Sequence, residues 1–153
     1  AATTHDVGER LTWYLFAPVS QRRPAWQDNA VRMQGVCTEC HNQNFIETFY
    51  DDADAATEKI NEWVLESDEI IAPLQENGLM TSAPFDEPID FTHFELWHHW
   101  GRTAKFGVWM QGADYVQWHG AYEMLGDRAE LIEMVNDKLE EAGLEPLELE
   151  EGE

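Results

Sequence analysis

The stretch Cys37-Thr38-Glu39-Cys40-His41 contains both cysteines of this 153-residue chain. If these residues bind a prosthetic group, the fold of the chain must be built around that group. Two thiols three positions apart, followed at once by histidine, are typical of the attachment site of a c-type haem. The thiols add to the two vinyl groups of the porphyrin, and the adjacent imidazole is then placed to bind the iron. The sequence therefore predicts at least one covalent haem c on Cys37 and Cys40, with His41 as an iron ligand.

Two other readings of this motif are weaker. A thioredoxin-like redox pair requires a βαβ context, and no buried strand run precedes Cys37. A zinc site would need a second pair of soft ligands, and the chain has no further cysteine. Because covalent haem attachment is extracytoplasmic in this class, we expect a periplasmic or other extracytoplasmic location. No leader opens the chain, so we expect a mature protein or part of a longer one.

Charge and composition exclude several classes of protein. Acidic residues outnumber basic ones 31 to 9, for a formal net charge of -22, which disfavours binding to nucleic acid or to an anionic membrane surface. Aromatic residues make up 12% of the chain, which argues against disorder. No apolar run approaches the roughly 20 residues of a membrane span.

The apolar spacing predicts an all-α fold, because apolar residues recur three and four positions apart and no stretch alternates with a period of two. Three helices are predicted before residue 80: a short one within residues 7–16, one from 26 to about 40, and a long one over 42–78 that Pro73 kinks or breaks and Gly78 ends. A loop over 80–88, a second long helix over 88–125 and a final helix from Asp127 to Ala142, ended by Gly143, are predicted to follow. The predicted domains are a haem-attachment segment (1–42), a long-helix bundle (43–143) and an acidic tail (144–153).

The second long helix would measure about 55 Å, longer than a compact domain of this size can cover. We therefore expect its aromatic face to be covered by other copies of the chain or by a larger parent chain.

Six histidines are present, and a six-coordinate haem needs one more ligand besides His41. His5 precedes Asp6 and is a candidate for that second iron ligand, although a surface position is an equal alternative. His98 and His99 point about 100° apart on a regular helix, so only one of them can bind a given iron. The other would bond a carboxylate or a haem propionate, and Arg102 could likewise neutralise a propionate.

Four motifs occur in an order that resembles a known family: residues 4–8 (THDVG), 36–41 (VCTECH), 95–102 (ELWHHWGR) and 114–120 (DYVQWHG). Together they are similar to the C-terminal part of the octahaem hydroxylamine oxidoreductase family, which includes hydrazine dehydrogenases. The similarity runs from about residue 3 to 142 and corresponds to the last third or so of a family member.

The resemblance implies a multihaem cytochrome c fold whose long C-terminal helices pack between the subunits of a trimer. It also implies oxidation of hydroxylamine or hydrazine, or reduction of nitrogen oxides, with electrons passed along a haem chain to a redox partner cytochrome. Cys37, Cys40 and His41 would carry the last haem, and His5 matches a family axial ligand. Tyr115 is the first candidate for the catalytic tyrosine that bonds to the haem of a neighbouring subunit, with Tyr122 and Tyr50 as the alternatives.

The attachment motifs of the other haems are absent, so this polypeptide alone could not complete that chemistry. We expect a haem-bearing portion of a multihaem oxidoreductase, working in a homotrimer or with a haem-rich partner chain and in contact with further haems. A stand-alone monohaem electron-transfer cytochrome is the main alternative, and a structural assembly subunit is a third.

Overall fold

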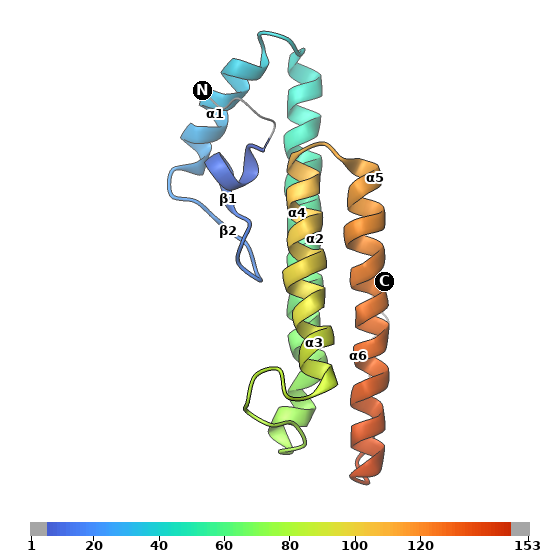
Figure 1. Ribbon diagram of the computed structural model, residues 1–153. Helices are drawn as coiled ribbons and strands as arrows, with labels where there is room; N and C mark the ends of the chain where they lie inside the picture. The colour runs from blue at the N-terminus through green and yellow to red at the C-terminus, as the bar shows by residue number, and fades with distance from the viewer. Residues whose placement is uncertain (1–5, 148–153) are drawn as a thin grey trace.

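The fold is a row of long antiparallel helices with a smaller N-terminal unit at one end. In this computed structural model, which describes residues 6–147, the long helical segments form three rods, and α2 (Gln43–Glu76) is the first of them. The chain returns along it through α3 (Pro88–Phe94), η2 (Glu95–Gly101) and α4 (Arg102–Trp109). It then reverses again into α5 (Ala113–Val116), η3 (Gln117–Ala121) and α6 (Tyr122–Glu141), which lie beside the other two rods (Figure 1). The fold is thus mostly helical, as predicted.

Glycine ends two of the helices where the sequence predicts it. After α2, Gly78 adopts a left-handed φ of +66°, and the amide of Leu79 donates to the carbonyl of Leu74 at 2.8 Å. The same closing turn follows α6 at Gly143, with φ +71°. Glycine takes this conformation without the steric cost that a Cβ imposes, so both predicted ends are confirmed.

The long helix does not break at Pro73, because α2 runs through that residue to Glu76. Ile70, Ile71 and Leu74 flank the proline and are buried in the core, which holds the helix in place on both sides of the lost hydrogen bond.

The second long helix is also shorter than predicted, because it ends at Trp109 instead of continuing to residue 125. The chain turns at Gln111, which has a left-handed φ of +59°, and the amide of Gly112 donates to the carbonyl of Gly107 at 2.9 Å. The third rod consequently starts at Ala113, and Asp127 lies inside α6, not at the start of a final helix. The length of this helix therefore gives no reason to expect a partner surface.

Residues 6–25 differ most from the prediction. Instead of a helix over 7–16, the chain forms one π-helical turn, η1 (Gly8–Thr12), and then two short antiparallel strands, β1 (Trp13–Tyr14) and β2 (Gln21–Arg22). The Arg22 guanidinium lies between the rings of Trp13 and Trp26, 4.0 and 4.1 Å from their centroids. It also pairs with Asp54 of α2 at 2.7 Å, so cation–π contacts and an ion pair fix this hairpin to the first rod.

Two apolar clusters hold the molecule together. The larger one joins the three rods along most of their length, and the smaller one packs the N-terminal unit and α1 (Trp26–Cys37) on the first turns of α2 and on Trp109. Gly8 permits the smaller cluster, because a Cβ there would lie 2.5 Å from the Trp109 ring. Within residues 6–147, no helix combines the length and apolar character that crossing a lipid bilayer requires.

Candidate functional site

The Cys37–His41 motif forms a tight turn between two helices. Cys37 is the last residue of α1, and its carbonyl accepts from the amides of Cys40, at 3.1 Å, and His41, at 2.9 Å. Asn42 then caps α2 by accepting from the amide of Phe45 at 2.9 Å. The helix end and the cap together bring both thiols and the imidazole onto one short turn.

The two thiols have different surroundings, and they are not joined in a disulfide. Cys37 is half-buried and packs against the smaller apolar cluster, and burial raises the pKa of its thiol. Cys40 is exposed. The His41 ring stacks on Phe45, with 4.6 Å between the centroids and 16° between the planes. Stacking uses the face of an imidazole, whereas iron binds a lone pair in the ring plane, so this contact orients the ring in a way compatible with ligation.

A groove of about 450 Å³ lies beside this turn along the start of α2. Its lining residues are Asn42, Asn44, Phe45, Thr48, Phe49, Asp52 and Gln111. Phe45 and Phe49 give the groove the flat apolar surface that a porphyrin face requires.

An orphaned polar atom lies close to the motif as well. The Tyr50 hydroxyl is buried and has no hydrogen-bond partner among the described residues. Burial, and then the charges of Cys37 and Asp54, hold the pKa of Tyr50 above its ordinary value. An attached haem fits the residues of this region. They provide two thiols and an imidazole as donors, a flat groove and an unpaired hydroxyl.

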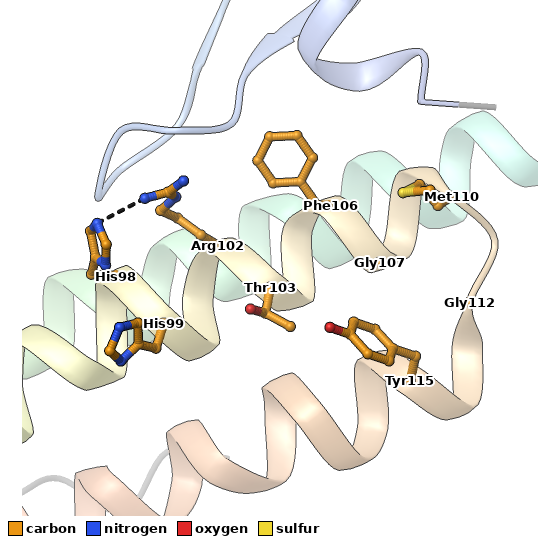
Figure 2. Close-up of a pocket in the computed structure, with 9 residues that line it drawn as sticks. All are labelled: His98, His99, Arg102, Thr103, Phe106, Gly107, Met110, Gly112 and Tyr115. Carbon is orange, nitrogen blue, oxygen red and sulfur yellow. Dashed lines mark hydrogen bonds between the residues drawn. The ribbon is translucent and has the colours of Figure 1, made fainter. Parts of the chain in front are cut away.

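A second and larger pocket, of about 620 Å³, opens between α4 and the third rod (Figure 2). It is lined by His98, His99, Arg102, Thr103, Phe106, Gly107, Met110, Gly112 and Tyr115. Figure 2 shows the Tyr115 hydroxyl pointing across from α5 toward Thr103 of α4. The structure therefore brings four residues singled out in the sequence into one pocket: His98, His99, Arg102 and Tyr115.

His98 and His99 have different roles in this pocket. Arg102 Nη1 lies 2.8 Å from His98 Nε2, and a guanidinium can only donate, so the His98 ring accepts at Nε2 and carries its proton on Nδ1. Burial, and then the charges of Arg102 and His99, lower the pKa of His98. With its lone pair occupied, His98 cannot bind a metal in this arrangement. The His99 side chain is 56% exposed, and its Nδ1 lies 3.7 Å from Glu95 Oε1.

The pocket edge next to Tyr115 contains a distorted helical turn. The Tyr115 and His119 rings lie 5.0 Å apart, and His119 departs from helical geometry, with φ -116° and ψ 25°. His119 lies in η3, while His98 and His99 lie in η2, so both π-helical segments of the long rods carry histidine. Such segments are frequent at functional sites.

Two ionisable groups, one buried and one half-buried, have shifted pKa values that the sequence did not predict. Lys105 is fully buried and donates to the carbonyls of Ala17, at 3.0 Å, and Pro18, at 2.9 Å. Burial, and then the charge of Arg102, lower its pKa to about 8. Burial also raises the pKa of Asp127 to about 7, with further contributions from three glutamates. A periodic pattern cannot distinguish such residues from the many charged residues that face solvent.

His5 lies outside the described residues, so its proposed role as an iron ligand is not addressed by the geometry. Among residues 6–147, no group of three or more His, Cys, Asp or Glu side chains gathers as a metal site.

Comparisons with known proteins identify the fold. No protein-family model matches the chain. A search of curated proteins gives no match either. The fold is similar to a solved structure described as a "Hypothetical multiheme protein", with a TM-score of 0.70 and 21% sequence identity over 80% of this chain. The chain spans 25% of the length of that protein. At this identity the likeness concerns the fold, which resembles part of a multihaem protein.

Proposed function

We propose that this chain is the haem-bearing portion of a multihaem oxidoreductase that oxidises hydroxylamine or hydrazine, or reduces nitrogen oxides. One observation carries the proposal: the chain has a complete Cys37–His41 attachment motif on a helix-terminal turn, within a fold that resembles part of a multihaem protein. The reaction class comes from the four ordered sequence motifs and not from the fold.

The residues of the motif would bind the haem in two different ways. Cys37 and Cys40 would form the thioether links, His41 would bind the iron, and His5 would be a second iron ligand. When bound, the haem accepts and releases single electrons. The phenyl rings of Phe45 and Phe49 in the adjoining groove would cover apolar porphyrin surface and exclude water.

The larger pocket would face a further haem that another chain or segment carries. Tyr115 is the proposed catalytic residue there, bonded to that haem as the resemblance implies. His99 is the better candidate for an additional ligand, because the lone pair of His98 is occupied by Arg102. The guanidinium of Arg102 also supplies a positive charge at the pocket for a propionate.

The assembly would be extracytoplasmic, as a homotrimer or with a haem-rich partner chain. The exposed aromatic side chains of Tyr115, Trp118 and Tyr122 lie on one side of the third rod and would be covered in such an assembly. The net charge of -22 favours a redox partner cytochrome with a positive surface.

Mass spectrometry of the purified assembly tests the proposal. We expect one haem-sized adduct on this chain that is lost in a Cys37→Ala, Cys40→Ala variant, and a covalent product that contains Tyr115. An unmodified wild-type chain would refute haem attachment. A monomer with one low-spin haem and no Tyr115 product would instead identify a stand-alone electron carrier.

A further inference from the structure

Tyr50 is a buried side chain with an unused polar atom. Its side chain is 6% exposed, and its hydroxyl has no partner among the residues the structure describes. Its ring lies 5.5 Å from that of Phe49 and 5.7 Å from that of Trp109, so the body of the side chain is fully packed. Burying an unpaired hydroxyl costs free energy, because the group gives up its hydrogen bonds to water.

The polar groups nearby are already committed to other partners. The Trp109 indole donates to Thr57 Oγ1 at 3.0 Å, and the Thr57 hydroxyl itself donates to the carbonyl of Ala53 at 2.8 Å. Cys37 packs against the same apolar cluster that contains Tyr50. Asp54, the other charged group that acts on Tyr50, accepts from the Trp13 indole at 2.8 Å and pairs with Arg22 at 2.7 Å. Cys37 therefore offers a direction in which the hydroxyl could find a partner.

We infer that Tyr50 is a positioning residue for the haem on Cys37–His41, and that its hydroxyl donates a hydrogen bond to an acceptor on the haem edge held by Cys37. The thioether sulfur at Cys37 is such an acceptor. The inference rests on the proposed function, because it requires the haem to be attached.

Two consequences distinguish this role from that of an ordinary core tyrosine. A hydrogen-bond donor next to a haem stabilises the reduced form, which carries one more negative charge, and so raises the reduction potential. The contact also stabilises the haem-loaded fold, since it satisfies the buried hydroxyl.

The test compares two variants of the haem-loaded protein, Tyr50→Phe and the control Tyr14→Phe. Both remove one hydroxyl and keep the ring, but the Tyr14 side chain is 44% exposed. For Tyr50→Phe we expect a lower midpoint potential of the haem on this chain and a melting temperature lower by about 2–4 °C. Tyr14→Phe should leave both quantities at their wild-type values.

The outcomes separate the inference from the proposed function. If Tyr50→Phe matches Tyr14→Phe in potential, the inference is wrong while haem attachment stands, and the hydroxyl is satisfied by water or not at all. A rise in melting temperature for Tyr50→Phe would also overturn it, because removing an unpaired hydroxyl stabilises a core. If no haem adduct is found on the wild-type chain, the proposed function fails, and the inference fails with it.

Discussion

Arg102 Nη1 lies 2.8 Å from Nε2 of His98, and this contact determines which nitrogen of His98 carries the proton. Because arginine only donates, the His98 ring is a neutral acceptor at Nε2. Two adjacent histidines that look equivalent in the sequence therefore differ in chemistry. Both line the pocket, but Arg102 engages the His98 ring, whereas the His99 side chain is 56% exposed.

An Arg102→Met variant should raise the pKa of His98. The variant removes the positive charge that is the second cause of the lowered pKa, while burial, the first cause, remains. The pKa should therefore move toward its ordinary value without reaching it. A ¹⁵N NMR titration of the imidazoles measures this shift, and Arg32→Met, at an exposed position on α1, is the control. An unchanged His98 titration in Arg102→Met would show that the guanidinium does not act on the ring.

An Asp127→Asn variant should change how stability depends on pH. The folded-state pKa of Asp127, about 7, lies above its value of 3.8 in a model compound, so the folded protein holds this proton more tightly than the unfolded chain. Wild-type stability should therefore fall as pH rises from about 4 to 7, and Asp127→Asn should remove that part of the decline. Chemical denaturation at several pH values measures it. Asp137→Asn, at an exposed site on the same helix, should keep the wild-type slope. Equal slopes in all three proteins would contradict the prediction.

A Lys105→Met variant should destabilise the protein by about 1–3 kcal/mol at pH 7, because it leaves the carbonyls of Ala17 and Pro18 without their donor. The loss should grow between pH 8 and 10. The lowered pKa of Lys105, about 8 against 10.5, makes wild-type stability rise over that range, and the variant lacks this gain. Equilibrium unfolding in urea measures both effects. Lys59→Met, on the surface of α2, should change stability little, and a matching result for both lysines would refute the role of Lys105.

Replacing glycine by alanine should have opposite effects at two positions of the third rod. A Cβ at Gly120 would lie 2.6 Å from the Cβ of Ala104, so Gly120→Ala should force the second and third rods apart and cost about 1–3 kcal/mol. At Gly126 nothing lies within 4 Å, so Gly126→Ala should stabilise α6 by about 0.5–1 kcal/mol. Thermal unfolding of the two variants checks both signs. Equal effects would show that the rods do not approach closely at Gly120.

The sequence predicted those features whose causes lie close together in the chain. Cys37, Cys40 and His41 are neighbours, so their shared turn follows from the motif alone. Gly78 and Gly143 end helices because each adopts a left-handed conformation, which depends on the glycine itself and not on distant contacts. The reversal after Trp109 was missed because Gln111, which is not a glycine, adopts the left-handed conformation there.

The larger pocket could not be predicted for the same reason. On one continuous helix, His99 and Tyr115, sixteen positions apart, would be separated by about 24 Å. The reversal instead folds the two residues onto facing rods around a common space. The Arg22 contacts that build the N-terminal hairpin likewise join residues distant in sequence, and no periodic pattern reports them.

The corner at residues 110–112 belongs to every cavity described above. Met110 and Gly112 border the space around Tyr115, and Gln111 borders the groove beside the Cys37–His41 turn. Gln111 and Gly112 also border a third hollow, of about 370 Å³, between α2 and α5. A displacement of residues 110–112 would therefore change the shape of all three cavities together. The cavity beside the Cys37–His41 turn and the cavity around Tyr115 are structurally coupled through this one corner.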